Sequence, residues 1–280
     1  MEVVKKEYAE VKVYNPLEVE IDFDFIAEIK DYLLFAKDSY LSFELVKEDK
    51  SDVYRLEYKK EPFYVKHYSY KSFNKIAKRF FRGAYGVKNL KTAVKLLAAG
   101  INAVQPIATL VYKRNFLFVD SIFIMKEVEG FDLYDYLAEN NFSYQFKRKL
   151  IIKLAKLWAE LYNNKFLHKD PNLFNLFINW DNGDFNLSLV DIDNIYKLPF
   201  IPKKLVVKNL FKFNERLIVN CNELGLELGK KELLLFCTEL VDALQWDNID
   251  LKSFIDQVIK GTKARLKRKQ KEHLWYKYSN

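Results

Sequence analysis

The order of hydrophobic and polar residues predicts a strand-rich first half of the chain. Residues 42–68 contain three runs rich in β-branched and aromatic residues, SFELV, VYRLEY and PFYVKHY, which the polar segments EDKSD and KKE separate. Such a pattern is typical of a three-stranded antiparallel meander. A helix is predicted at about residues 87–99, and two more strands, QPIATLVYK and NFLFVDSIFIM, within residues 105–125. We therefore expect a five-stranded antiparallel sheet with one inserted helix.

After Gly130 the apolar residues recur with the spacing of helices. Helices are predicted at residues 131–139, 144–164, and about 203–224, 230–245 and 250–272. A β-rich part followed by an α-rich part predicts an α+β protein with two lobes. We assign residues 1–126 to the first lobe and residues 127–280 to the second.

Residues 17–25 fit two kinds of element. Their sequence, LEVEIDFDF, alternates apolar and acidic residues as a strand does. The following residues, IAEIKDYLLF, have a helical pattern instead. The pattern alone leaves this segment open.

Composition excludes several classes of protein. The chain of 280 residues has only 8 Gly and 6 Pro, which excludes collagen-like and low-complexity sequences and favours long helices. Two cysteines, Cys221 and Cys237, without a partner motif exclude a disulfide framework, and three dispersed histidines argue against a zinc cluster. The net charge of +8 favours a phosphate-rich partner, such as a nucleotide, a nucleic acid or an anionic membrane.

The sequence offers no targeting or membrane-spanning segment. Its first residues, MEVVKKEYAEVKVYN, lack the basic and then apolar layout of a signal peptide. The most apolar window, Phe116–Met125, is ten residues long and contains Asp120, so it is too short to span a bilayer. We therefore expect a soluble, cytoplasmic protein.

The most informative segment is HKDPNLFNLFINWDNGDFNLSLVDIDN, residues 168–194. Asn182-Gly183 within it is a strong hairpin signal, because a two-residue turn needs residues that adopt positive φ. The flanking runs LFINW and FNLSLV are strand-like. If the turn centres on this dipeptide, Asn175 lies opposite Val190 and next to Asp191, within about 5–8 Å.

An asparagine oxygen beside an aspartate suits a hard cation such as Mg²⁺, which keeps waters and phosphate oxygens as its other ligands. Asp170, on the loop that enters the first strand, adds a carboxylate that suits a group orienting an acceptor hydroxyl. Phosphoryl transfer needs little beyond positioned reactants and neutralised phosphate charge. The segment therefore predicts a phosphoryl-transfer site of Asp170, Asn175 and Asp191. Two alternatives stay open: Asp193 as the metal ligand after a register shift, and three surface turn residues without a common role.

The order His-x-Asp, an asparagine five residues later, a hairpin, and an apolar run ending in aspartate is similar to the catalytic segment of the protein-kinase fold. The chain resembles the lipopolysaccharide kinases, the Kdo and heptose kinase family, over roughly residues 63–217. Five segments between residues 63 and 217 carry the resemblance: YVKHY, FFRGAYGVKNLKTAVKLLAAGINAVQPIA, HKDPNLFN, SLVDIDN and NLFKFNERL. The resemblance implies a protein-kinase-like fold with a β-rich N-lobe and a mainly helical C-lobe. It also implies ATP-dependent phosphorylation of a Kdo or heptose hydroxyl in the lipopolysaccharide inner core.

The resemblance also implies roles for individual residues. Asp170 would orient the sugar hydroxyl and accept its proton, while Asn175 and Asp191 would hold Mg²⁺ on the phosphates of ATP. Lys66, on the third strand of the meander, would contact the α- and β-phosphates. The segment 125–130 would be the hinge, where the main-chain groups of Glu127 and Val128 would bind adenine. His168 would be structural.

Three departures from the protein-kinase pattern stand out. The turn at residues 47–52 has no glycine, although kinases use a glycine-rich loop there. The helix at residues 84–99 has no Asp or Glu to pair with Lys66, so the partner is either Asn89, as a neutral substitute, or an acidic residue from elsewhere in the chain. Pro171 follows Asp170 where an apolar residue is usual. A non-catalytic pseudokinase, or a kinase of another small molecule or of protein, are therefore the alternative functions.

The end of the chain is basic. Residues 260–272, KGTKARLKRKQKE, are followed by HLWYKYSN with its three aromatic residues. The simplest interpretation is a solvated helix end. A basic, aromatic tail could also rest on anionic lipid, where a lipid-linked oligosaccharide acceptor would be found, or hold RNA. We expect a lipid-linked core oligosaccharide as the acceptor, a peripheral position on the inner face of the inner membrane, and no nucleic-acid partner.

Overall fold

The chain folds as two units, Met1–Val128 and Glu129–Asn280, and each is described by itself. The structure, a computed structural model, describes residues 2–8, 11–49, 51–69, 84–113, 119–140 and 142–275. Residues 80–83 of the predicted motif and 276–280 of the basic tail lie outside these ranges. Within them, no helix is both long and apolar enough to cross a bilayer. The chain divides after Val128, so both expected hinge residues lie in the first unit.

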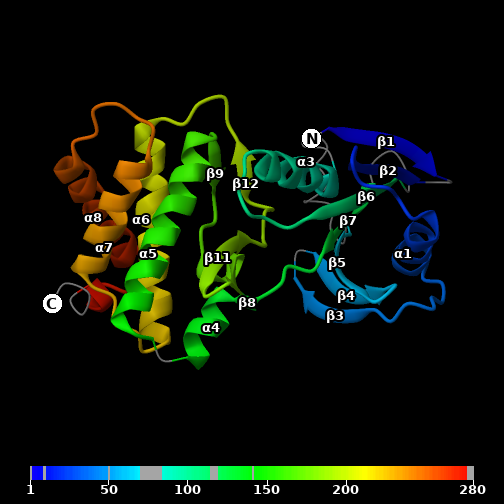
Figure 1. The fold of residues 1–280 in the computed structure, drawn as a ribbon, viewed down its shortest axis with the longest axis horizontal. Helices are drawn as coiled ribbons and strands as arrows, with labels where there is room; N and C mark the ends of the chain where they lie inside the picture. The colour runs from blue at the N-terminus through cyan, green and yellow to red at the C-terminus, as the bar shows by residue number, and fades with distance from the viewer. Residues whose placement is uncertain are drawn as a thin grey trace. The chain divides into compact units, whose positions relative to one another are not determined.

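The first unit contains a seven-stranded antiparallel sheet (Figure 1). Its strand order is β1-β2-β6-β7-β5-β4-β3. The strands are β1 (Val3–Tyr8), β2 (Val11–Pro16), β3 (Glu44–Glu48), β4 (Asp52–Tyr58), β5 (Glu61–Tyr68), β6 (Pro106–Lys113) and β7 (Val119–Lys126). The last five are the predicted ones, and the meander of β3, β4 and β5 is confirmed.

The expected number of five strands is wrong because the hairpin of β1 and β2 extends the sheet beside β6. Val11 and Val13 of β2 are almost fully buried and lie opposite Tyr112 and Leu110 of β6. In β1 the valines Val3 and Val4 are adjacent, as are Lys5 and Lys6, so the alternation that marks a strand is lost there. The exposed lysines are tolerated because β1 is the edge strand of the sheet.

Helix α1 (Phe23–Phe35) begins within the ambiguous segment of residues 17–25, so the end of that segment is helical. The Asp22 carboxylate caps it by accepting hydrogen bonds from the N–H groups of Asp24 and Phe25. The apolar side of α1 packs into the same core as the buried face of β2, β5, β6 and β7. Tertiary burial of this apolar side therefore decides in favour of a helix.

Helix α3 (Tyr85–Ala98) covers the other face of the sheet. Thr109 of β6 and Ser121 of β7 lie on that face, because their neighbours along each strand, such as Leu110 and Ile122, belong to the core on the face that α1 covers. The Thr109 hydroxyl donates to the Gly86 carbonyl at 3.1 Å, and the Gly86 N–H donates to Ser121 Oγ at 3.2 Å. A Cβ on Gly86 would lie 2.7 Å from the Thr109 methyl group, so the start of α3 needs a glycine to approach the sheet.

The second unit is mainly helical, as predicted (Figure 1). Its helices are α4 (Leu133–Glu139), α5 (Tyr144–Asn163), α6 (Lys203–Glu223), α7 (Lys230–Ala243) and α8 (Leu251–Arg268). Its short elements are β8 (Phe131–Asp132), β9 (Phe166–His168), the 3₁₀ turn η1 (Leu173–Asn175), β10 (Leu176–Asp181), β11 (Asp184–Leu189) and β12 (Ile195–Lys197).

Aromatic packing joins the central helices of this unit. Trp158 of α5 and Phe213 of α6 are both fully buried, and their rings stack with centroids 4.3 Å apart. Helix α5 also packs on α7, and α6 packs on α8. Strands β9 and β11 contact α5, and the loop between β9 and β10 carries the predicted residues Asp170 and Asn175.

Candidate active site

The β10–β11 hairpin has the register that its turn predicts. Leu176 pairs with Leu189, and Asp181 pairs with Asp184. Asn182 and Gly183 adopt φ values of 49° and 80°, which supply the two-residue turn. The Val190 N–H donates to the Asn175 carbonyl at 3.1 Å, so Asn175 is adjacent to Val190 and one residue from Asp191. The unshifted register favours Asp191 over Asp193 as the neighbour of Asn175.

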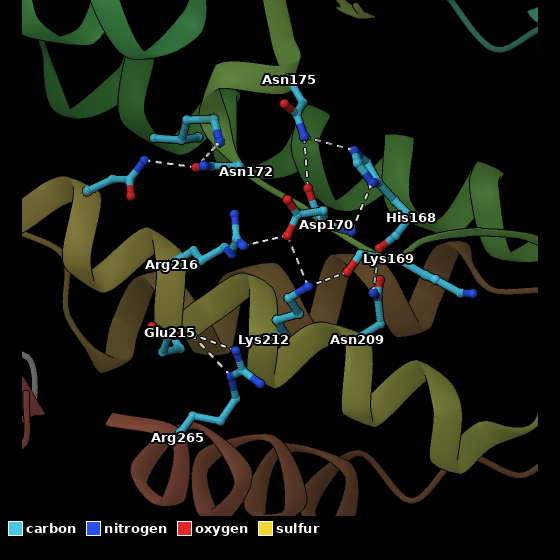
Figure 2. Close-up of polar contacts among 12 residues, drawn as sticks. His168, Lys169, Asp170, Asn172, Asn175, Asn209, Lys212, Glu215, Arg216 and Arg265 are labelled. Atoms are coloured by element: carbon cyan, nitrogen blue, oxygen red, sulfur yellow. Dashed lines mark hydrogen bonds and ion pairs between the residues drawn. The ribbon is translucent and has the colours of Figure 1, made fainter. Parts of the chain in front are cut away.

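The side chain of Asn175 is held by its nitrogen. Nδ2 donates to the Asp170 carbonyl at 2.8 Å and lies 3.3 Å from His168 Nε2 (Figure 2). Its oxygen therefore points away from the loop, as Figure 2 shows. Fixing one end of a ligand side chain in this way orients its donor atom toward a metal.

Asp170 contacts two cationic side chains from α6. Lys212 Nζ lies 3.0 Å from Asp170 Oδ1, and Arg216 Nη2 donates to the same oxygen (Figure 2). The Asp170 side chain stays 39% exposed, so solvent reaches it despite both partners. Sequence reasoning did not assign a role to Lys212 or Arg216, although both lie in the segment NLFKFNERL and are spaced one helical turn apart.

His168 is a buried, neutral support for this loop. Burial lowers its pKa to about 4, and this outweighs the nearby negative charges of Asp191 and Asp170. The Asp170 N–H donates to His168 Nδ1 at 3.3 Å, and the Asn175 amide nitrogen lies beside Nε2. A doubly protonated ring would therefore place an N–H against a donor at both of its nitrogens. His168 also pairs with Ile195 in the two-stranded β9–β12 sheet. These contacts fit the structural role that was expected for it.

The other predicted residues lie in the first unit. Lys66 is half-buried on β5, between Val53 of β4 and Phe123 of β7. Asn89, the expected neutral substitute for the helix carboxylate, is fully buried in α3, and its Nδ2 donates to the Tyr68 hydroxyl at 2.6 Å. The amide nitrogen of Asn89 therefore supports β5 through Tyr68.

The expected hinge is built around Glu127. Its N–H donates to the Pro62 carbonyl at 3.1 Å, and its carboxylate forms a bidentate pair with Arg55 of β4 at 3.0 Å for each bond. Among the described residues, no hydrogen bond uses the Glu127 carbonyl or the main chain of Val128. The Glu127 N–H is thus occupied, whereas the Glu127 carbonyl and the N–H and carbonyl of Val128 are available to a ligand.

An amide oxygen and a carboxylate are the candidate metal donors of the second unit. In the described ranges, no three His, Cys, Asp or Glu side chains converge on a point where a metal could sit. An amide oxygen and a carboxylate at the hairpin base form a smaller set, which is what Mg²⁺ uses when phosphates and waters complete its octahedron.

Comparison with known proteins identifies a family and a solved structure of similar fold. The family model described as Lipopolysaccharide kinase (Kdo/WaaP) family matches residues 50–234 of this chain. Among solved structures, "WaaP in complex with acyl carrier protein" is similar over 98% of this chain and 100% of that chain, with a TM-score of 0.65 and 17% sequence identity. At this identity the similarity concerns the fold, and it confirms the predicted kinase-like α+β architecture. No curated protein matches.

Proposed function

Because the chain belongs to the lipopolysaccharide kinase (Kdo/WaaP) family, we propose that it transfers the γ-phosphate of ATP to a sugar hydroxyl of the lipopolysaccharide inner core. The acceptor sugar in this proposal is a Kdo or a heptose. The observation that carries the proposal is that Asn175 contacts both sides of the candidate site. Its side chain binds the Asp170 carbonyl, and its own carbonyl accepts from the N–H of Val190, which precedes Asp191. This geometry is what a magnesium-assisted phosphoryl transfer requires.

Asn175 Oδ1 and Asp191 are the proposed magnesium ligands. When bound, Mg²⁺ would neutralise charge on the phosphate oxygens. The contact of Asn175 Nδ2 with the Asp170 carbonyl fixes the amide nitrogen, which would leave the amide oxygen for the ion. The same contact links the metal ligand to the residue that receives the acceptor.

Asp170 is the proposed acceptor-orienting residue. Its carboxylate would accept a hydrogen bond from the attacking hydroxyl and, as the new oxygen–phosphorus bond forms, its proton. The bond between the γ-phosphorus and the bridging oxygen breaks, and ADP leaves with that oxygen. Because little proton transfer is needed early in this reaction, orientation of the hydroxyl is the larger part of the role.

Nucleotide binding is proposed for the first unit. Lys66 would contact the α- and β-phosphates as a point charge. At the hinge, the Val128 N–H would donate to the adenine ring and the Glu127 carbonyl would accept from its amino group, since the Glu127 N–H already binds Pro62. The Arg55–Glu127 pair would hold β4 and the hinge in register while the base binds.

We propose a peripheral position on the inner face of the inner membrane. Four exposed basic residues of α8 support it: Lys260, Lys263, Lys267 and Arg268. The other part of the basic segment is used within the unit, because Arg265 and Lys269 pair with Glu215. Trp275 is buried rather than presented as an aromatic anchor. Each basic residue near an anionic surface contributes about 1 kcal/mol, so four give a weak and reversible attachment.

The first test is transfer of labelled γ-phosphate in the presence of Mg²⁺ to a panel of acceptors. The panel contains Kdo- and heptose-bearing core lipids in anionic or neutral vesicles, free sugars, and a generic protein substrate. We expect label on a core lipid, more of it in anionic vesicles, and none after chelation of Mg²⁺. Label on protein or on unrelated small molecules would favour another kinase. No label, and no rise in the melting midpoint with Mg²⁺ and ATP, would favour a pseudokinase.

We further propose an acylated carrier protein as a partner, because the solved relative is in complex with acyl carrier protein. The second unit contains a cavity of about 90 Å³ with mainly apolar walls, which include Leu150, Leu154, Phe213, Phe236 and Cys237. Such a cavity suits an alkyl chain. Acyl-loaded carrier protein should raise the melting midpoint of the chain, whereas the same carrier without an acyl group should not. Equal effects of the two carriers would exclude the cavity as the binding site.

A further inference from the structure

Helix α6 carries a row of four polar residues on one face: Asn209, Lys212, Arg216 and Asn220. Their spacing of three, four and four residues places them one above another along the helix. The neighbouring faces of α6 are buried in the core of the unit, with Val206, Leu210 and Phe213 among their residues. This row is here called the polar stripe.

The polar stripe contacts the predicted catalytic loop residue by residue, in the order of the chain (Figure 2). Asn209 Nδ2 donates to the His168 carbonyl at 2.7 Å. Lys212 Nζ donates to the Lys169 carbonyl and to Asp170 Oδ1. Further along, Arg216 donates to the same Asp170 oxygen, and Asn220 Nδ2 donates to Asn172 Oδ1 at 3.0 Å. Every contact involves a side chain of α6 as the donor.

Further polar contacts, one at the polar stripe and the others toward α8, fix the helix itself against rotation. The Tyr162 hydroxyl of α5 donates to Asn209 Oδ1 at 2.8 Å. Glu215, which is 1% exposed, pairs with Arg265 of α8 at 3.1 Å and with Lys269 at 2.7 Å. Asn214 Nδ2 donates to Thr262 Oγ1 of α8 at 3.2 Å. A stripe on a helix held in this way has a fixed position relative to the unit, and the loop that it binds shares that position.

We propose that the polar stripe sets the orientation of Asp170, with Lys212 and Arg216 as its positioning residues. This inference rests on the proposed function, in which Asp170 receives the acceptor hydroxyl. Both cations bind Oδ1, so rotation of the carboxylate about its Cβ–Cγ bond would break two charge-assisted hydrogen bonds at once. The second oxygen, Oδ2, is left to the acceptor.

The charges of the cluster also fit a phosphate-transfer site. A lone carboxylate beside a nucleotide triphosphate would repel it, and this repulsion is strong where water is partly excluded. Lys212 and Arg216 add two positive charges to the single negative charge of Asp170, so the cluster carries a net positive charge. The carboxylate can therefore stay close to the phosphates without opposing them.

The test replaces each positioning residue by methionine, which keeps an unbranched chain and removes the charge. Lys208→Met is the matched control, because Lys208 lies one turn before Lys212 on α6 and is exposed. We expect Lys212→Met and Arg216→Met each to lower kcat by about 10- to 100-fold, the usual loss when a supporting contact to a reacting group is removed. Each variant leaves the cluster neutral rather than positive, so KM for ATP should rise much less than kcat falls, and Lys208→Met should behave as wild type. Arg216→Lys should recover part of the rate, because it restores one donor.

A merely structural ion pair would give a different result. Lys212→Met and Arg216→Met would then lower the melting midpoint but leave kcat of the folded enzyme near that of wild type, and this outcome would overturn the proposal. A double-mutant cycle of Asp170→Asn with Lys212→Met, read as melting midpoints, tests the contact without any acceptor. We expect Lys212→Met to cost less in the Asp170→Asn background. Additive shifts of the melting midpoint would show that Lys212 does not position Asp170, and this would overturn the proposal. Coupled shifts in a chain that phosphorylates no core lipid would reject only the proposed function.

Discussion

Replacing Asp170 or Asp191 by alanine is expected to lower phosphate transfer by about 10³-fold, since a positioned proton acceptor and a metal site each contribute on this order. The two variants should fail for different reasons. Without Asp170 the chain should still bind Mg²⁺ and ATP, because Asn175 and Asp191 remain. Without Asp191 the metal loses its carboxylate, and the nucleotide loses the ion that neutralises its phosphates. Transfer of labelled phosphate, together with melting midpoints measured with ATP and with or without Mg²⁺, separates the two.

Asp193→Ala is the control for this pair of variants. Asp193 has the same chemistry and lies two residues beyond Asp191, but the observed register places Asn175 opposite Val190 and hence beside Asp191. We expect Asp193→Ala to keep its activity. If instead Asp193→Ala is inactive and Asp191→Ala is active, the metal ligand is Asp193. Full activity in both Asp170→Ala and Asp191→Ala would remove the proposed site.

The hairpin could be predicted because its information is local. Asn182-Gly183 determines the turn, and the turn together with the alternation of LFINW and FNLSLV determines which residues face each other. The position of Asn175 beside Asp191 follows from these features within twenty residues of sequence. Helices α5, α6, α7 and α8 were predictable for a similar reason, since each carries a long apolar side with helical spacing.

The contacts that the sequence did not reveal are those between distant segments. Lys212 and Arg216 reach Asp170 from more than forty residues away, and nothing in their local pattern distinguishes them from solvated lysines and arginines of a helix. The same limit applies to the β1–β2 hairpin, because the adjacent Lys5 and Lys6 interrupt the alternation of β1, the edge strand of the sheet. Partners of this kind are determined by the packing of α6 and β6, and local periodicity carries no information about them.

Gly130→Ala is expected to destabilise the second unit by about 3 kcal/mol or more, because it combines backbone strain with a steric clash. Gly130 has φ of 111°, a conformation that residues with a Cβ rarely adopt. A Cβ there would lie 2.2 Å from the Ile178 carbonyl oxygen and 3.1 Å from Asn179 Cα, both of which are main-chain atoms of β10 that cannot turn aside. Denaturant unfolding of the purified variant would measure the loss.

Gly183→Ala separates the two causes of this loss. Gly183 also has positive φ, 80°, but a Cβ there would meet nothing within 4 Å. We therefore expect it to cost only about 1 kcal/mol, the strain alone. Equal losses in the two variants would show that the contact with β10 is unimportant.

A larger loss for Gly130→Ala also has a functional consequence. Gly130 precedes Phe131 of β8, and Phe131 pairs with Ile178 near the start of β10. Pushing β8 away from β10 would loosen the strand that begins directly after Asn175, so the Gly130→Ala chain that remains folded should also respond less to Mg²⁺ and ATP than the Gly183→Ala chain.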